Sequence, residues 1–247
     1  MTRKSLVALL CATCAMSIWA GPAWAGPPYD TDDPAPTDPG GWEIYNFAVT
    51  DGLGSARDTT AGFDLNYGAL PGVQLTATLP VEFSRDSTGT RSGAGDLELG
   101  IKYRFYNNED KGFSAAIFPR VILPTAARGF GSGGTGVLLP VWVQQDLGKW
   151  SVFGGGGYLM PSGSGGRDHW LAGLALSHEL SPRLSLGAEV FREGAEARSG
   201  SATTRVNLAV NRKLGGPFAL LLAAGPTFDD AGGPAHYHTY TALALNF

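Results

Sequence analysis

The sequence predicts an all-β fold, a transmembrane antiparallel β-barrel of about 12 strands, on three observations. From residue 42 onward, stretches of about 9 to 11 residues alternate apolar with polar or small side chains, which is the length that crosses a bilayer at a tilt of roughly 45°. The connections alternate between short and long, and the last stretch ends on Phe247. Outer-membrane barrels have short periplasmic turns and longer extracellular loops, so both chain ends are expected in the periplasm.

Residues 1–25 have the pattern of a secretory signal peptide that is cleaved off. Two basic residues precede an apolar run, and Ala23 and Ala25 are the small residues that a signal peptidase reads. The apolar run is shorter than the roughly 20 residues of a spanning helix, which disfavours a membrane anchor. Cys11 and Cys14 are the two cysteines of the chain, and both belong to this leader. The mature chain is therefore expected to have no disulfide and no thiol nucleophile.

The composition after the leader argues against several other classes of protein. The leader removes two basic residues, which leaves 16 basic and 22 acidic residues and a net charge of −6. This charge argues against nucleic acid as a partner. No later segment is apolar over the length of a spanning helix.

Residues 26–40 read GPPYDTDDPAPTDPG, and their five prolines forbid a helix or a central strand. The aspartates in this segment could suggest calcium, but the prolines break the loop that would gather them, and no downstream Glu completes an EF-hand pattern. We therefore expect an extended arm that lies either in the periplasm or inside the barrel, without metal, followed by a barrel over residues 41–247.

The expected strands follow in order along the chain. They are Trp42–Thr50, Thr60–Tyr67, Val73–Glu82, Asp96–Tyr106, Phe113–Leu123, Val137–Asp146, Trp150–Met160, His169–Leu180, Leu184–Glu193, Thr203–Leu214, Pro217–Phe228 and Tyr237–Phe247. The short connections are 68–72, 107–112, 147–149, 181–183 and 215–216, whereas the others, such as 84–95 and 124–136, are longer. Pro119 falls within the fifth strand and predicts a bulge or a close-packed inward element.

The side chains of these strands sort onto two faces. In the fourth strand, for example, Leu97 and Leu99 share one face while Glu98 and Lys102 share the other. A charge at the centre of the lipid face costs about 2 to 4 kcal/mol, so the polar face is expected to line the lumen. The candidate lumen-lining residues are Asp64, Asn66, Gln74, Asp96, Glu98, Lys102, Arg104, Arg120, Glu179, Glu189, Arg205, Asn207 and Asn211. Their charges nearly balance, so we expect no strong selection for one ionic sign and mostly cross-strand ion pairs.

Outward-facing aromatic residues are expected in two belts at the ends of the strands, as in known outer-membrane barrels. The predicted belts are Tyr67, Tyr103, Phe105, Phe113, Trp150, Phe218 and Phe247 at the periplasmic end, and Tyr158, Trp170, Phe228 and Tyr237 at the other end.

No catalytic constellation is visible in the sequence, and the chain is expected not to be an enzyme. Ser177 and His178 are contiguous, and neighbours in a strand point to opposite faces, so the histidine cannot activate the serine. His236 and His238 share a face and could hold a metal, but solvation at the loop rim explains them better. We therefore expect no cofactor and no metal.

Several segments match a known family. They include Thr31–Pro34 (TDDP) followed by Trp42 and Glu43, then Gly95–Gly100 (GDLELG) and Leu123–Thr125 (LPT). These segments resemble the bacterial outer-membrane family labelled for the MetA pathway of phenol degradation, and the resemblance covers most of the mature chain. It implies a transporter, and it supplies no catalytic residues to carry over.

The sequence therefore predicts an outer-membrane channel or facilitated transporter of a Gram-negative bacterium for small solutes, aromatic or apolar ones included. The alternatives are a closed structural or adhesive barrel and, third, an outer-membrane lipid hydrolase. The expected partners are outer-membrane lipid, a small-molecule solute and the barrel-assembly machinery, which recognises a terminal aromatic residue such as Phe247.

Overall fold

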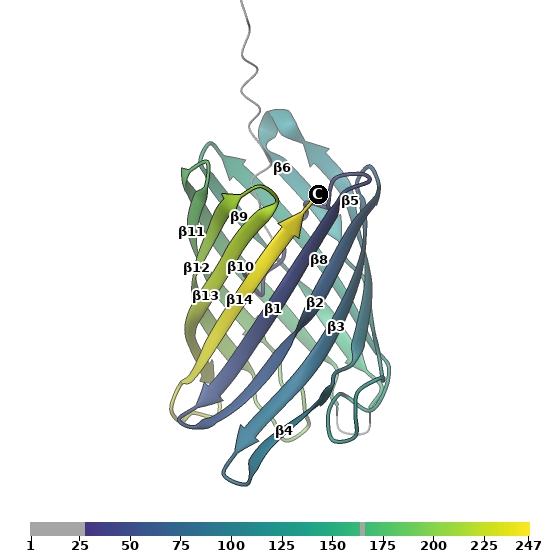
Figure 1. Cartoon of the computed structure of the whole chain (residues 1–247), viewed down its shortest axis with the longest axis vertical. Helices are drawn as coiled ribbons and strands as arrows, with labels where there is room; N and C mark the ends of the chain where they lie inside the picture. The colour runs from purple at the N-terminus through teal and green to yellow at the C-terminus, as the bar shows by residue number, and fades with distance from the viewer. Residues whose placement is uncertain (1–27, 164–165) are drawn as a thin grey trace, which may run out of the picture.

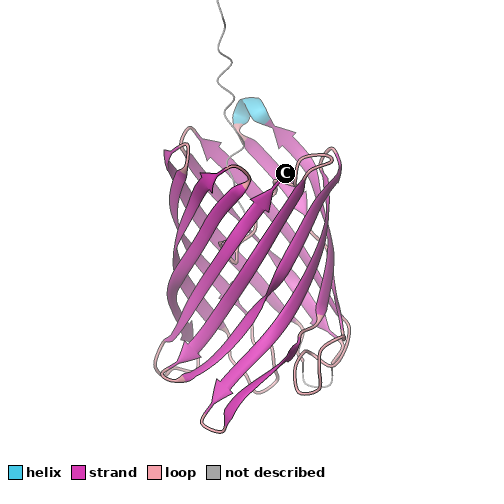
Figure 2. Ribbon diagram, viewed as in Figure 1, coloured by secondary structure: helices cyan, strands magenta, loops and turns pink. Residues whose placement is uncertain are grey.

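The computed structural model describes residues 28–163 and 166–247, so the leader predicted over residues 1–25 lies outside the described residues. Figure 2 shows a molecule built almost wholly of strands, with a short helix, η1 (Glu109–Lys111), at one rim. Within the described ranges, no helix is long and apolar enough to cross a membrane. The strand segments are β1 (Trp42–Leu53), β2 (Ala56–Leu70), β3 (Val73–Asp86), β4 (Gly89–Ala94), β5 (Leu97–Asn108), β6 (Phe113–Ile117), β7 (Arg120–Leu123), β8 (Gly136–Leu147), β9 (Trp150–Pro161), β10 (His169–Ser181), β11 (Leu184–Glu193), β12 (Thr203–Gly215), β13 (Phe218–Asp229) and β14 (His236–Asn246).

The strands form one closed antiparallel sheet (Figure 1). Neighbours along the chain pair with one another, and β14 pairs with β1 to close the ring. At the seam, the backbone N–H of Trp42 donates to the carbonyl of Phe247 over 2.7 Å, and the N–H of Phe247 donates back to the carbonyl of Trp42 over 3.1 Å. Closure leaves the sheet without a free edge. The predicted pairing of the last strand with the first is confirmed.

The segments make up a barrel of 12 strands, which confirms the predicted number. β4 and β5 both pair with β3, and together they form the fourth strand. β6 and β7 both pair with β5 and β8, and together they form the fifth.

The fifth strand is interrupted at Phe118 and Pro119, where the sequence predicted a bulge. Its register with β5 and with β8 is the same before and after the interruption, so no residue is inserted there and the prediction of a bulge is wrong. Pro119 has no N–H to contribute to the ladder. The backbone still bonds on both sides: the N–H of Phe118 donates to the carbonyl of Pro140, and the N–H of Ile101 donates to the carbonyl of Pro119, each over 3.1 Å. The break therefore costs little pairing, and the strand continues across it.

The sequence predicted long loops at two places where the structure has tight turns, so these two predictions are wrong. The segment 84–95 is a hairpin, in which β3 runs to Asp86 and β4 begins at Gly89. The Asp86 carboxylate accepts the N–H of Thr88 over 2.7 Å, an Asx turn that allows a tight connection. β1 and β2 are likewise joined through a tight turn in which Gly54 has φ 62°. The other connections at this end are long: 124–135, 162–168, 194–202 and 230–235.

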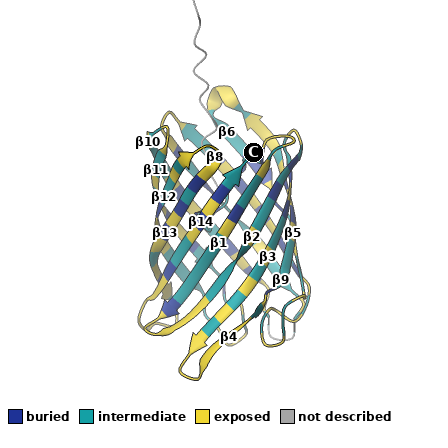
Figure 3. Ribbon diagram, in the orientation of Figure 1, coloured by how far each residue is buried: buried dark blue, intermediate teal, exposed yellow. Residues whose placement is uncertain are grey.

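The two faces of the strands differ as predicted, and Figure 3 shows the alternation of buried and exposed positions along them. In β3, Gln74 and Thr76 are buried, whereas Leu75 and Leu79 are 44% and 46% exposed. Exposed apolar side chains cover the outside of the wall, which is the surface that lipid requires. Most of the predicted belt aromatics are exposed, and Tyr67 and Phe113 are half-buried.

Candidate functional site

Residues 28–40 form an extended arm inside the barrel, without strand or helix. Thr31, Asp33 and Thr37 in this arm are buried. The arm bonds first to β11 and β12 and then to β3 and β5, which lie on opposite sides of the ring. Of the two places expected for the arm, the structure therefore has it in the lumen.

The first anchor of the arm is on β11 and β12. The Glu189 carboxylate accepts the backbone N–H of Thr31 over 2.5 Å and that of Asp30 over 3.2 Å. The Asp30 carboxylate in turn pairs with the Arg205 guanidinium over 2.7 Å, and the Asn207 amide donates to Glu189 over 3.0 Å. Two acidic groups are thus brought together, and one guanidinium and several N–H donors compensate them.

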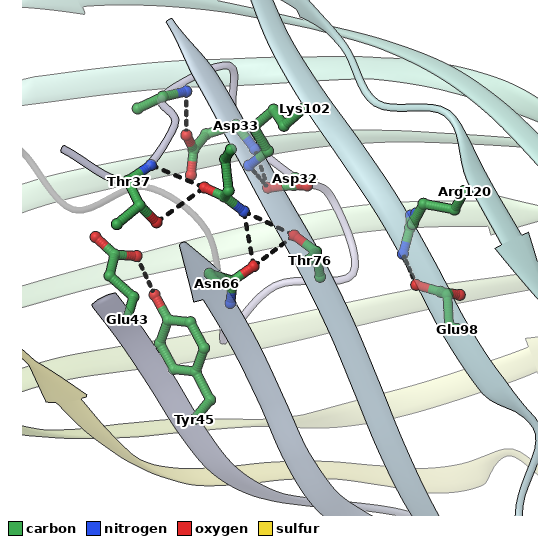
Figure 4. Close-up of polar contacts among 12 residues, drawn as sticks. Asp32, Asp33, Thr37, Glu43, Tyr45, Asn66, Thr76, Glu98, Lys102 and Arg120 are labelled. Carbon is green, nitrogen blue, oxygen red and sulfur yellow. Dashed lines mark hydrogen bonds and ion pairs between the residues drawn. The ribbon is translucent and has the colours of Figure 1, made fainter. Parts of the chain in front are cut away.

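The second anchor, on β3 and β5, is drawn in Figure 4. The Lys102 ammonium lies 2.9 Å from the Asp32 carboxylate, and both side chains are largely buried, at 5% and 17% exposure. The Gln74 carbonyl accepts the backbone N–H of Thr37 over 2.8 Å, and the Gln74 amide donates to Asn66 over 2.7 Å. Gln74, Asn66 and Thr76 thus bond to one another within the wall, while the Gln74 carbonyl and the Lys102 ammonium are bonded to the arm.

Asp33 is the least compensated acid of the arm. One carboxylate oxygen accepts the N–H of Ala35 over 2.5 Å, and the other is buried without a hydrogen-bond partner among the described residues. Burial raises the pKa of the Asp33 carboxyl to about 7, and the Lys102 ammonium opposes this shift.

Glycines in the wall make room for the arm. A β-carbon at Gly173 would collide with the Thr31 side chain, and one at Gly187 would collide with the Tyr29 hydroxyl. Both glycines lie in strand interiors, where glycine otherwise weakens a strand. Close approach of the arm explains their presence.

A cavity of about 140 Å³ lies between the arm and the wall formed by β1, β2, β3, β5 and the fifth strand. It has room for several water molecules. Its acidic lining residues outnumber the basic ones by six to two: Asp30, Asp32, Asp33, Glu43, Asp64 and Glu98 face Lys102 and Arg120. The expected balance of charge is therefore wrong for this cavity, because it counted strand residues without the arm. No group of acids and histidines in the described residues has the geometry to hold a metal ion.

All the predicted lumen residues except Asp96 and Asn211 fall into three sets, and Asn211 is half-buried on β12 near the short-turn rim. Gln74, Asn66, Lys102, Glu189, Asn207 and Arg205 belong to the network that holds the arm. Asp64, Glu98 and Arg120 line the cavity, and Arg120 pairs with Glu98 over 3.0 Å, which is the expected cross-strand ion pair. Arg104 and Glu179 are half-buried near the short-turn rim, where neither side chain bonds to another of the described residues.

Asp96 does not line the lumen as a strand residue. β5 begins at Leu97, and the Asp96 carboxylate instead accepts the N–H groups of Ala126 and Ser132 over 3.0 and 2.8 Å. It organises the 124–135 loop.

Sequence reasoning missed Glu43 and Tyr45, which line the cavity from β1. The Tyr45 hydroxyl donates to the Glu43 carboxylate over 2.9 Å, as Figure 4 shows. Both residues alternate with Trp42 and Ile44 in the sequence, so the parity of the first strand could have identified them.

Part of the lumen is apolar. Phe118, Leu138, Trp142, Leu171 and Phe191 form a buried cluster, with Leu159 packed against it. The indole N–H of Trp142 has no hydrogen-bond partner among the described residues. The side chains of the buried cluster are at most 8% exposed, so they fill this part of the lumen, and only Phe118 also lines the cavity.

The histidines give no support to a hydrolase. The His178 ring stacks on Trp150 with the centroids 4.0 Å apart, whereas Ser177 lies on the opposite face of β10. His238 is buried and bonds Asp51 over 2.9 Å, while His236 is exposed. The two histidines do not meet at a metal site.

Comparison with known proteins agrees with this architecture. The model of a family described as "Putative MetA-pathway of phenol degradation" matches residues 44–232. No curated protein is significantly similar to the chain. Among solved structures, an outer membrane channel from Pseudomonas putida F1 is 18% identical, with a TM-score of 0.74 over 89% of this chain and 100% of that chain.

Two porins are similar in fold at lower identity. The KdgM porin in complex with disordered oligogalacturonate is 10% identical, with a TM-score of 0.59 over 83% of this chain and 99% of that chain. The NanC porin is 8% identical, with a TM-score of 0.60 over 83% of this chain and 98% of that chain. At these identities the likeness concerns the fold of outer-membrane barrels.

Proposed function

The chain belongs to the family described as "Putative MetA-pathway of phenol degradation", and on that premise we propose that it is an outer-membrane channel or facilitated transporter for small solutes. We propose further that residues 1–25 are a signal peptide that directs its export and is then cleaved. One observation carries the proposal: an arm held by hydrogen bonds, ion pairs and a ring contact of Tyr29 with Phe153 lies beside a polar cavity in the lumen. Such an arm can shift without breaking the barrel, because apart from the backbone bond of Gly40 to Gly68 at its end, its bonds to the wall are made by side chains outside the strand ladder.

The lining of the lumen supports a class of solute. Of the six acids around the cavity, Asp30, Asp32 and Glu98 pair with Arg205, Lys102 and Arg120. Asp33, Glu43 and Asp64 have no ion-pair partner among the described residues, and this excess of acidic over basic groups disfavours anions. The aromatic rings of Tyr29, Tyr45 and Phe118 also line the cavity, and they suit an apolar or aromatic group. We therefore infer that the solutes are small, neutral or cationic, with an apolar or aromatic part.

Solute flux into liposomes tests this function. Benzyltrimethylammonium and benzenesulfonate each carry a benzene ring and a permanent charge of opposite sign, so neither crosses lipid readily. We expect the protein to pass the cation faster than the anion, and tetramethylammonium, which lacks the ring, more slowly than the aromatic cation. Absence of conductance and of flux for all three, together with normal uptake in a deletion strain, would refute a transport role.

A closed structural barrel is the second candidate, and the arm anchored on both walls favours it. The two candidates differ when the arm is loosened. A channel should conduct more in Lys102→Met, which removes the cation that holds Asp32. A closed barrel should show no flux in either form.

A further inference from the structure

The outer wall carries a pair of arginines at the end opposite the chain terminus. At this end β3 and β4 form a hairpin that projects past the rest of the wall, and β2 begins beside it (Figure 1). Arg57 on β2 and Arg85 on β3 are direct cross-strand partners. Their register continues without a shift from Phe63 opposite Leu79, so the arginines share the lipid-facing side of the strands.

Neither arginine has a partner. Like charges directly opposite each other on a sheet repel, yet in the described residues no carboxylate, hydrogen-bond acceptor or aromatic ring contacts either guanidinium. Asp86, the next residue, binds its own turn through Thr88. Arg192, on the same face at the same end, is by contrast paired with Asp230. The unmatched pair is a site for an anion.

The surroundings of the pair narrow the chemistry of that anion. A hollow of about 220 Å³ is lined by Arg57, Thr59, Phe83, Ser84, Arg85 and Thr90. Two guanidiniums provide planar sets of N–H donors, and hydroxyl groups add further donors, a combination that matches the oxygens of a phosphate. Phe83, 42% exposed on the same face, provides an apolar floor.

The depth of the hollow indicates where this phosphate would come from. The exposed aromatics Trp170, Phe228 and Tyr237 mark the edge of the apolar band at this end, and Phe83 belongs with them. Arg85 comes two residues beyond Phe83, towards the tip of the hairpin. Charges placed there lie at the level of lipid headgroups, where a basic pocket can bind an anionic one.

We propose that Arg57 and Arg85, with Thr59 and Thr90, bind the phosphate of a lipid headgroup in the outer leaflet, with an acyl chain of that lipid lying over Phe83. In a Gram-negative outer membrane this lipid is the phosphorylated glycolipid lipid A. The site rests on the outer-membrane location and not on solute passage, so a barrel that transports nothing would still have it.

Lipid retention by the purified mature barrel in detergent tests the site. Native mass spectrometry would measure binding of bisphosphorylated lipid A, of its dephosphorylated form and of inorganic phosphate alone. We expect the bisphosphorylated lipid to bind best, and the double variant Arg57→Gln/Arg85→Gln to bind it on the order of tenfold more weakly. Arg91→Gln is the matched control, because Arg91 lies on the same hairpin but pairs with Ser84 on the other face.

Several results would overturn the proposal. One is equal binding of the bisphosphorylated lipid to the wild type and the double variant, and another is an equal loss in Arg91→Gln. Equal binding of the dephosphorylated lipid would exclude phosphate recognition, and binding of inorganic phosphate as tight as that of the lipid would exclude a lipid site. If the double variant does not fold, the comparison of the two lipids on the wild type still decides.

Discussion

Replacing Lys102 by Met should release the arm while leaving the barrel folded. The Lys102 ammonium lies 2.9 Å from Asp32, and it is also the nearest cation to Asp33. Removing one member of a buried ion pair costs about 3 to 5 kcal/mol, because the remaining charge is left uncompensated. The cavity beside this pair admits water, so we take the lower end, about 3 kcal/mol, which is roughly a 150-fold change in an equilibrium constant.

This cost falls on the docking of the arm, since the arm can leave the lumen without breaking the strand ladder. The assay is maleimide labelling of Thr31→Cys, a position that is fully buried when the arm is docked. Cys11 and Cys14 belong to the predicted leader, so the mature chain offers no competing thiol. Labelling requires the undocked arm, and its rate should rise by roughly two orders of magnitude in Lys102→Met.

The matched control is Arg104→Met, because Arg104 is on the same strand and loses the same charge without bonding to any described residue of the arm. The free energy of docking should change by no more than about 0.5 kcal/mol in Arg104→Met, so its labelling rate should stay within roughly twofold of that of the parent. Heat-dependent gel mobility would show that both variants are folded barrels. Equal labelling of Lys102→Met and Arg104→Met would refute the assignment of Lys102 as an anchor.

Three further predictions concern the arm and the closing strand. Docking of the arm raises the pKa of the Asp33 carboxyl from 3.8 to about 7, so docking is strongest at low pH and weakens as the pH rises through that interval. The labelling rate of Thr31→Cys, divided by that of the same variant with Asp33→Asn added, should therefore increase from pH 5 to pH 8. A constant ratio would contradict this. Gly173→Ala places a methyl group against Thr31, which should cost about 1 to 3 kcal/mol of docking and accelerate labelling while gel mobility stays unchanged. Phe247→Ala should reduce the folded yield in the outer membrane by impairing recognition by the assembly machinery. The melting temperature of the folded fraction should change little, because Phe247 is 67% exposed and its seam bonds are made by the backbone. An unchanged yield would argue against a role of Phe247 in assembly.

The membrane-spanning part of the fold was predictable because its cause is local. Each strand separates lipid from lumen, so a side chain such as Leu75 or Gln74 reveals its face through its position in a two-residue repeat. Even the misfit at Pro119 was visible, since a residue without an N–H cannot continue a ladder.

Prediction failed where the strands leave the membrane. The paired strand ends Arg57–Asp58 of β2 and Arg85–Asp86 of β3 are polar on both faces, so no alternation distinguishes strand from loop. Its pairing comes from the continuing register and from tight turns, which the polarity pattern does not encode.

The candidate site was predicted in part. Lys102, Glu189 and Asn207 were recognised as inward-facing, but cross-strand pairs were expected for them. Lys102 and Glu189 bind the arm instead, through contacts such as that of Asp30 with Glu189, 159 residues apart in the chain. No spacing rule reaches so far, and the composition of residues 26–40 was compatible with either a periplasmic or a luminal position.

The sequence by itself determined the barrel, its 12 strands and the inward face of its wall, because the contrast between lipid and lumen acts on every strand separately. Only the tertiary structure decided what occupies the lumen and which sign of charge prevails beside it. Those properties arise when the ring closes and brings β12 and β5 to opposite sides of one arm, so that Asp30 meets Arg205 and Asp32 meets Lys102.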